Sequence, residues 1–188
     1  MTGATGDLGP RVPVGVDEEF LRQHVRSVPD YPVQGVTFLD ITPLLASAGA
    51  YRMAVDALRE AVADISFDLV LGIEARGFLL AAPLALELGK GFIPARKPRK
   101  LPLTTARVDY QLEYGAAAIE IHEDAVAPGQ RVLIVDDVLA TGGTSATAAE
   151  LVGRLGGEVA GFAYLIEIGV LEGRRRLGGR PVRAILRY

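Results

Sequence analysis

The segment VLIVDDVLATGGTSATA, residues 132 to 148, determines how this chain is expected to fold. Aliphatic residues run directly into Asp136 and Asp137, and a loop of small residues follows, with Gly142 and Gly143 near its end. A buried strand that leads through such a loop into a helix is typical of a phosphate site, because the loop amides and the helix N-terminus both present partial positive charge. The segment therefore predicts a strand, an anion-binding loop and a helix.

The loop itself can offer consecutive backbone amides to a phosphate, and two of its residues add side-chain hydroxyls. Its glycines allow the backbone to approach a ligand closely. The stretch has no lysine after its second glycine and contains no GxGxxG pattern, so neither a P-loop nor a dinucleotide-binding fold is indicated. The residues expected to bind the phosphate are Ala140, Thr141, Gly142, Gly143 and Thr144.

The two aspartates would repel a phosphate placed beside them, so they require a different ligand. Carboxylates accept hydrogen bonds from hydroxyl groups, and a ribose offers its 2′- and 3′-hydroxyls. We therefore expect Asp136 and Asp137 to hold a ribose whose 5′-phosphate lies in the adjacent loop. Ligands of open parallel sheets bind at the carboxyl ends of the strands, which is where these residues fall.

The composition limits the class of protein. With 188 residues, 49% hydrophobic and 23% charged, the chain has an ordinary globular composition. A net charge of -3 and a pI near 5.5 disfavour a nucleic-acid-binding protein, which normally has a basic face. The chain has no cysteine and two histidines, so disulfides, thiolate zinc sites and multi-histidine metal sites are not expected.

The sequence also predicts a cytoplasmic protein with no membrane partner. No apolar run approaches the roughly 20 residues that span a bilayer. Residues 1–16 are rich in glycine and proline and lack the basic and apolar regions of a signal peptide. They are expected to form a loose tail before a single domain at residues 17–188.

Helical and strand-like segments alternate along the chain. This alternation predicts an α/β fold, with a mainly parallel central sheet flanked by helices. Two segments with alternating polarity, 106–112 and 115–122, predict an added antiparallel hairpin. The other expected elements are helices at 17–28, 50–65, 76–89 and 145–157, and strands at 67–73, 91–96, 131–135, 159–168 and 182–188.

The segment quoted first resembles the 5-phosphoribosyl-1-diphosphate (PRPP) binding motif of the type I phosphoribosyltransferases, in which two acids precede a stretch ending in TGGT. Several segments are similar to the adenine phosphoribosyltransferases of that family in order and spacing. They are VPDYPVQGVTFLDITPLL (28–45), GIEARGF (72–78), ARKPRKLP (95–102), LEYG (112–115) and VAPGQRVLIVDDVLATGGT (126–144). The similarity covers roughly residues 17 to 176 and implies the type I phosphoribosyltransferase fold, with a small N-terminal hood at about 28–45 and a flexible hairpin lid at about 101–115.

The resemblance implies a pentosyltransferase of purine salvage. Such an enzyme transfers the 5-phosphoribosyl group of PRPP to N9 of adenine and produces AMP and diphosphate. The resemblance further implies a homodimer and Mg²⁺ as cofactor. The metal is expected to bind with the diphosphate and to reach Asp136 and Asp137 through water, without direct ligation by side chains.

Two of the similar segments contain cationic residues that suit a diphosphate: GIEARGF has one, and ARKPRKLP has four. A cation at a helix start opposes the helix dipole unless an anion offsets it, which favours an anion beside Arg76. The segment ARKPRKLP concentrates basic residues, and arginine suits bidentate contacts with phosphate. Together with the resemblance, these patterns predict a diphosphate site formed by Glu74, Ala75, Arg76, Arg96, Lys97 and Lys100.

The lid is expected to exclude water, which would otherwise capture an oxocarbenium-like sugar. By resemblance, Glu113 lies near N7 of the purine and Tyr114 closes over the site. With Arg76 they form the expected catalytic group.

The hood is expected to hold the adenine. An aromatic ring can stack on the base, so Phe38 is expected on one face and Val138 on the other. By resemblance, backbone groups near Thr37 and Leu39 meet N6 and N1 of adenine. Family members commonly carry a basic residue where this chain has Leu39, so its side chain is not expected to bind the nucleotide.

Two alternative functions are open from the sequence. A xanthine or hypoxanthine-guanine phosphoribosyltransferase would keep the ribose clamp, but such enzymes typically place a lysine beyond the phosphate loop. The first basic residue after Thr144 is Arg154. A non-enzymatic regulator that senses PRPP would need a DNA-binding module, for which this acidic chain offers no candidate.

Overall fold

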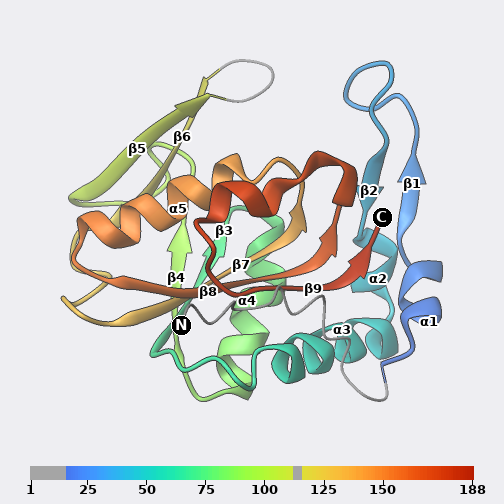
Figure 1. The fold of residues 1–188 in the computed structure, drawn as a ribbon, viewed down its shortest axis with the longest axis horizontal. Coiled ribbons are helices and arrows are strands. Elements are labelled where there is room, and N and C mark those ends of the chain that lie inside the picture. The colour runs from blue at the N-terminus through green and yellow to red at the C-terminus, as the bar shows by residue number, and fades with distance from the viewer. Residues whose placement is uncertain (1–15, 112–115) are drawn as a thin grey trace, which may run out of the picture.

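A five-stranded parallel sheet forms the centre of the computed structural model, which describes residues 16–111 and 116–188 (Figure 1). Its strands lie in the order β4–β3–β7–β8–β9, and each neighbouring pair is parallel. This arrangement confirms the predicted α/β fold. The strands are β3 (Leu69–Ile73), β4 (Gly91–Ala95), β7 (Arg131–Leu139), β8 (Glu158–Glu167) and β9 (Val182–Arg187).

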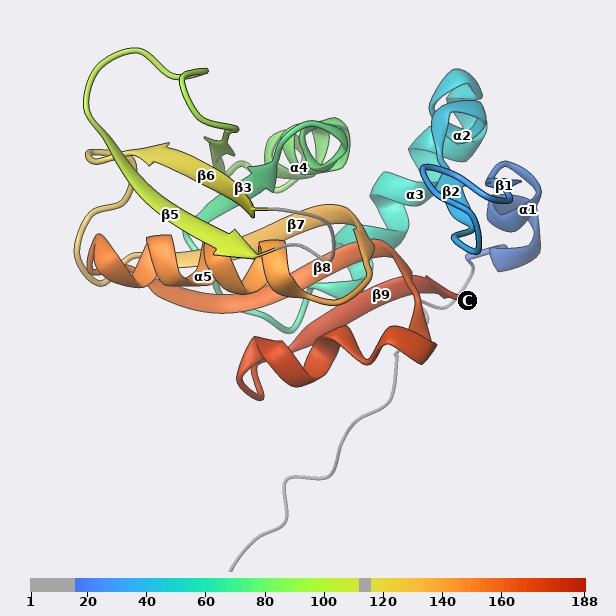
Figure 2. The ribbon, with the colours of Figure 1, turned by 90° about the horizontal axis from the view of Figure 1, so that it is seen from above.

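Helices cover both faces of this sheet (Figure 2). On one face lie α3 (Ala48–Ala61) and α4 (Arg76–Glu87), and on the other lies α5 (Gly143–Arg154). Successive side chains of a strand point to opposite faces, so β7 contributes to both layers of the core. Burial on both faces explains the near-continuous aliphatic runs of the central strands. In the part of the chain that the structure describes, no helix is long and apolar enough to cross a membrane.

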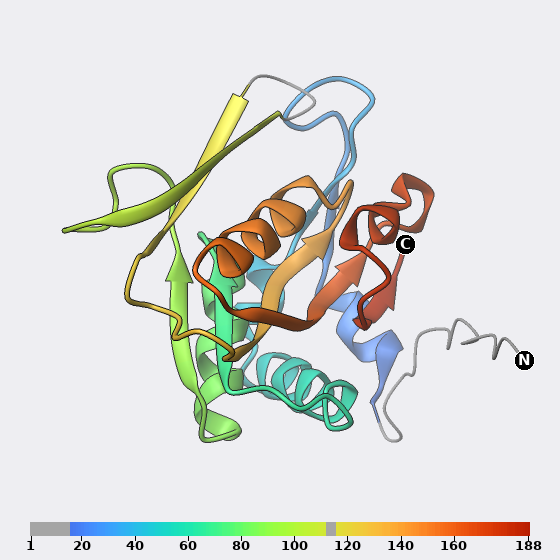
Figure 3. The same cartoon turned by 60° about the vertical axis from the view of Figure 1, so that its left-hand side comes forward.

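Two small antiparallel sheets project from the side toward which β3, β4 and β7 point (Figure 3). The predicted hairpin is confirmed by the pairing of β5 (Thr105–Gln111) with β6 (Ala116–His122). In the hood, β1 (Arg26–Val28) pairs with β2 (Phe38–Asp40). The short helix α2 (Thr42–Ala46) follows the hood, and the 3-10 turns η1 (Gly169–Leu171) and η2 (Gly173–Leu177) lie between β8 and β9.

The first helix is shorter than expected. The predicted cap is confirmed, because the Asp17 carboxylate accepts a hydrogen bond from the Phe20 amide at 2.9 Å. However, α1 covers only Glu18–Gln23, and residues that were expected to continue it form β1 instead. Pairing with β2, a contact between residues distant in the sequence, overrides the local helical pattern there.

The strand of the segment 132–148 ends later than expected, and its helix begins earlier, so the loop between them is shorter. Strand β7 continues past residue 135 to Leu139, because Asp136 and Val138 keep their pairing with Tyr164 and Ile166 of β8. Both aspartates therefore lie inside the strand. Helix α5 begins at Gly143, before the predicted start at residue 145, since Gly142 turns the chain with a left-handed backbone at φ 78°.

Candidate active site

The loop between β7 and α5 encloses a small cavity of about 70 Å³. The structure brings the whole predicted phosphate loop to this cavity together with one of the two aspartates. Only glycine fits at Gly142, because its φ is positive and a Cβ atom would collide with the Gly173 carbonyl oxygen. The lining residues are Asp136, Val138, Leu139, Ala140, Thr141, Gly142, Gly143, Thr144 and Ser145.

A buried hydrogen bond joins strand β8 to the first turn of α5, directly after the loop. The Tyr164 hydroxyl of β8 donates to Ser145 Oγ at 2.7 Å, and both side chains are buried. Burial raises the pKa of Tyr164, so the phenol stays protonated and can donate. This pair was not predicted, although a tyrosine inside an apolar strand signals a buried hydrogen-bond partner.

Asp137 is 3% exposed and its side chain lies beside Arg76, with 2.5 Å between Arg76 Nε and Asp137 Oδ2. The contact is an ion pair by distance, but its geometry is not that of a hydrogen bond. Within the described residues, Asp137 Oδ2 therefore accepts no hydrogen bond. A buried carboxylate oxygen without a donor is costly, and a ligand hydroxyl would satisfy it.

The neighbouring carboxylate of Asp136 is held by the backbone, because its Oδ1 accepts a hydrogen bond from the Asp137 amide at 2.9 Å. Part of the residue stays exposed, but protein atoms surround the carboxyl group. This burial raises the pKa of Asp136 well above its usual value, and the charge of Asp137 raises it further. A Cβ atom on Gly77 would lie 2.8 Å from Asp136 Oδ1, so a glycine there allows α4 to pack closely against β7.

Arg76 connects the aspartates with the hood. It is the first residue of α4, and its guanidinium group lies over the Phe38 ring of β2, 4.7 Å from the centroid. Tyr31 packs edge-on against the same ring at 5.3 Å. One set of contacts thus joins three predicted site residues. Arg76, predicted to bind diphosphate, contacts both Phe38, predicted to stack on adenine, and Asp137, predicted to bind ribose.

The other residues predicted to meet adenine differ in exposure. The Leu39 side chain is buried in the core against the face that carries α3 and α4, and Val138 packs partly against the same core. Thr37, immediately before β2, is exposed. The two residues whose backbone groups are predicted to meet adenine thus differ: the Thr37 side chain faces solvent, and the Leu39 side chain is in the core.

Glu74 contacts two of the other residues predicted to bind diphosphate, Arg96 and Lys97. Its Oε2 lies 3.0 Å from Arg96 Nε and accepts a hydrogen bond from the Lys97 amide at 2.7 Å. Burial raises the pKa of Glu74, but the two hydrogen bonds together with the charges of Arg96 and Lys97 outweigh it and hold the pKa below its usual value. Arg96 also reaches the Lys100 carbonyl at 3.4 Å, while the Lys97 and Lys100 side chains are exposed. The carboxylate of Glu74 therefore orients the guanidinium group of Arg96.

The loop that holds Glu74 continues through Ala75 into α4, and the peptide bond between Glu74 and Ala75 is cis. Ala75 precedes the first turn of the helix and its side chain caps nothing. Glu113 and Tyr114, predicted to act from the lid, lie outside the described residues.

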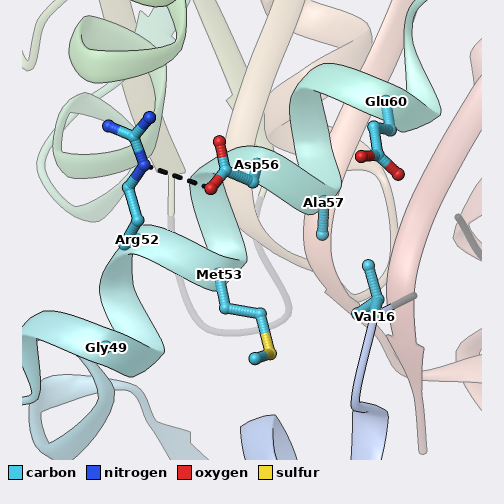
Figure 4. A pocket seen from close by; sticks show the side chains of 7 residues that line it. All are labelled: Val16, Gly49, Arg52, Met53, Asp56, Ala57 and Glu60. Carbon is cyan, nitrogen blue, oxygen red and sulfur yellow. Dashed lines mark hydrogen bonds and ion pairs between the residues drawn. The ribbon is translucent and has the colours of Figure 1, made fainter. Parts of the chain in front are cut away.

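A larger concavity of about 360 Å³ lies along α3 (Figure 4). Its arginine and one of its acids form a pair, with Arg52 Nε 3.1 Å from Asp56 Oδ2. It shares no residue with the loop cavity and contains none of the predicted site residues, so the smaller loop cavity, which lies at the N-terminus of α5, is the better candidate site. The lining residues are Val16, Gly49, Arg52, Met53, Asp56, Ala57 and Glu60.

Comparisons with known proteins agree with this geometry. Residues 40–180 match the model of the phosphoribosyl transferase domain. The chain is 51% identical over 168 residues to the adenine phosphoribosyltransferase of Kosmotoga olearia, covering 89% of this chain and 99% of that protein. It is 52% identical over 168 residues to the adenine phosphoribosyltransferase of Thermotoga maritima, covering 89% and 97%.

Solved structures give the same result. The adenine phosphoribosyltransferase of Thermoanaerobacter pseudethanolicus superposes with a TM-score of 0.88 at 47% identity, covering 90% of this chain and 99% of that chain. The enzyme from Saccharomyces cerevisiae, solved with adenine and an iminoaltritol bisphosphate, superposes with a TM-score of 0.83 at 37% identity, covering 89% and 97%. The chain therefore belongs to the phosphoribosyl transferase domain family, among its adenine phosphoribosyltransferases.

Proposed function

We propose that residues 17–188 act as one catalytic domain that transfers the 5-phosphoribosyl group of PRPP to N9 of adenine and releases AMP and diphosphate. The observation that carries the proposal is the loop cavity between β7 and α5, which is lined by Asp136, the residue before Asp137 in β7. An amide-lined loop and a pair of carboxylates match the two ends of a ribose 5-phosphate. Adenine as the base follows from family membership, and the yeast relative was solved with adenine bound.

The carboxylates serve as the ribose clamp in this proposal. The ribose hydroxyls donate to Asp136 and Asp137 and satisfy the buried Asp137 Oδ2. The 5′-phosphate lies against the amides of residues 140–144. The diphosphate offers Arg76 a second anionic partner, and Arg96, Lys97 and Lys100 add positive charge on the same side.

Catalysis is then chiefly positional and electrostatic. Adenine stacks on Phe38, with Val138 on its other face and the backbone at Thr37 and Leu39 meeting N6 and N1. An adenine that stacks on the ring face covered by the Arg76 guanidinium would have to displace that group. By family resemblance, Glu113 contacts N7 of the purine and Tyr114 closes the lid over the site.

Mg²⁺ fits this site as a partner of the diphosphate. Among the described residues, no group of three or more histidine, aspartate or glutamate side chains could hold a metal ion by itself. Asp136 and Asp137 provide hard oxygen atoms of the kind that Mg²⁺ prefers, and they would hold the ion through water. When bound, Mg²⁺ supplies charge neutralisation for the leaving diphosphate.

The proposed active form is a cytoplasmic homodimer joined through α4 and β4. Leu79 and Leu86 on the outer side of α4 are exposed, as is Phe92 of the neighbouring strand β4. Phe92 packs edge-on against Phe78, with 5.8 Å between the ring centroids, so the patch is continuous from helix to strand. Exposed apolar patches of this kind mark interaction sites, and the partner proposed for this one is a second copy of the chain, as the family resemblance implies. Absence of cysteine agrees with a reducing compartment.

The test is a base-selectivity assay. Purified protein is incubated with PRPP, Mg²⁺ and one radiolabelled base at a time: adenine, hypoxanthine, guanine or xanthine. AMP formation from adenine alone supports the proposal. A nucleotide formed from one of the oxopurines would favour the alternative transferases, and PRPP binding with no nucleotide product would favour a PRPP-sensing regulator.

A further inference from the structure

The 3-10 turn η2 packs directly against the phosphate loop. Figure 3 shows the red helical turns before β9 beside the start of α5. A Cβ atom on Gly142 would collide with the Gly173 carbonyl oxygen, and a Cβ atom on Gly173 would collide with the Ala140 carbonyl oxygen. The two backbones therefore approach without an intervening side chain, which places η2 directly beside the loop.

A partly buried ion pair holds η2 in this place. Arg174 donates to both carboxylate oxygens of Glu167, at 2.7 and 2.8 Å, and Glu167 is 3% exposed at the end of β8. Arg174 Nη1 also donates to the Val182 carbonyl of β9 at 3.1 Å. A bidentate arginine–carboxylate pair is geometrically specific, so η2 is held to the sheet at a defined distance from the loop.

The next two arginines have different surroundings. Arg175 Nη1 lies 2.7 Å from Glu172 Oε2, in an exposed pair. Arg176 Nη1 would lie 3.6 Å from a Cβ atom on Gly143, so this guanidinium group borders the phosphate loop. Within the described residues, the structure gives Arg176 no carboxylate partner within 4.0 Å, and the first turn of α5 contains no acid. The loop therefore has an adjacent cation whose charge is not neutralised locally.

We propose that Arg176 binds the 5′-phosphate of the ligand held in this loop. A phosphate monoester carries close to two negative charges at neutral pH, and residues 140–144 contribute amides and hydroxyls but no cationic side chain. The planar guanidinium group suits the phosphate oxygens and supplies the missing positive charge. This inference rests on the proposed function, because it assigns a further residue to the same site.

The test compares Arg176→Ala with the matched control Arg175→Ala, which removes from the same turn an arginine that pairs with Glu172. Calorimetry measures the dissociation constants of AMP, ribose 5-phosphate and adenosine for each variant. Arg176→Ala should weaken AMP and ribose 5-phosphate binding about tenfold, as expected for a hydrogen bond to a charged group, and leave adenosine binding unchanged. Arg175→Ala should leave all three unchanged, and Arg176→Lys should recover part of the lost affinity.

Three results would overturn the role of Arg176. One is AMP affinity equal to that of the parent protein, and another is an equal loss in Arg175→Ala, which would indicate a general effect of charge. The third is an equal loss of adenosine binding, which would indicate a distorted site. A parent protein that makes no AMP from adenine and PRPP would contradict the proposed function alone, since the ribose 5-phosphate measurement does not depend on transfer.

Discussion

At the residue scale, the Asp137 carboxylate has a buried oxygen, Oδ2, that accepts no hydrogen bond among the described residues. Asp137→Asn removes the charge that would hold a ribose hydroxyl. Hydrogen bonds to charged groups contribute about 1.5–3 kcal/mol, so kcat/KM for PRPP should fall about 10- to 100-fold, with a higher KM and slower turnover. Steady-state kinetics measure the effect, and Asp56→Asn on α3 is the control that should change nothing. Equal kcat/KM in Asp137→Asn and the parent would remove Asp137 from the clamp.

The second aspartate gives a prediction about pH. Burial and the charge of Asp137 raise the pKa of Asp136 in the folded state. The stability that this proton contributes is fully present below the unfolded-state pKa and is lost as the pH rises through the folded-state pKa. Asp136→Asn removes the titration but keeps an oxygen for the Asp137 amide, so the variant should be more stable than the parent near neutral pH.

Scanning calorimetry without ligand checks this at several pH values. The gain in Tm of Asp136→Asn over the parent should be larger at about pH 8 than at about pH 4. A tenfold difference in proton affinity between the folded and unfolded states corresponds to about 1.4 kcal/mol, and each kcal/mol to about 2–4 °C of Tm in a domain of this size. A Tm difference that stays constant over this range would show that Asp136 titrates normally.

At the element scale, the hydrogen bond from Tyr164 to Ser145 ties the first turn of α5 to β8. Tyr164→Phe should lower the free energy of unfolding by about 1 kcal/mol, because it leaves the ring packed and removes a buried hydrogen bond. Denaturant unfolding of Tyr164→Phe, Ser145→Ala and the double variant gives the coupling between the two side chains. A coupling energy near zero would mean that the pair does not join the two elements.

The contact between η2 and the phosphate loop gives a second prediction at this scale. Gly173→Ala places a Cβ atom against the Ala140 carbonyl and must displace the loop. It should destabilise the fold by about 1–3 kcal/mol and weaken phosphate binding. Gly153→Ala is the matched control, because nothing lies within 4 Å of a Cβ atom at that position of α5 and alanine favours helix. Unfolding curves and AMP titrations that are the same for both variants would contradict the close contact.

At the scale of the whole molecule, the exposed patch on α4 and β4 predicts self-association. Leu86 is 82% exposed there, and Leu86→Glu places a charge in the proposed interface. Sedimentation should show a dimer of the 19.9 kDa chain for the parent and a shift toward monomer for the variant. Val170→Glu, at an 85% exposed position on η1, is the control that should remain dimeric. A parent protein that sediments as a monomer would exclude the dimer.

Most of the fold could be predicted because the longer elements have strong local patterns. The aliphatic runs of β3, β7 and β8 and the apolar stripe of α3 are visible in short windows of sequence. Strand β1, helix α2 and the turn η2 were missed because they are three to five residues long, and pairing or packing with distant segments decides them. The end of β7 was predicted too early for the same reason, because pairing with β8 extends the strand to Leu139.

The sequence by itself determined the strand–loop–helix unit at residues 132–148, with its glycines and paired acids, because amide donors and a helix N-terminus are produced by adjacent residues. Only the tertiary structure decided which distant side chains surround it. Arg76 reaches both Asp137 and Phe38, Tyr164 reaches Ser145, and Arg176 reaches the rim at Gly143. These contacts depend on the order of parallel strands and the packing of η2, which place residues far apart in the chain at one end of the sheet.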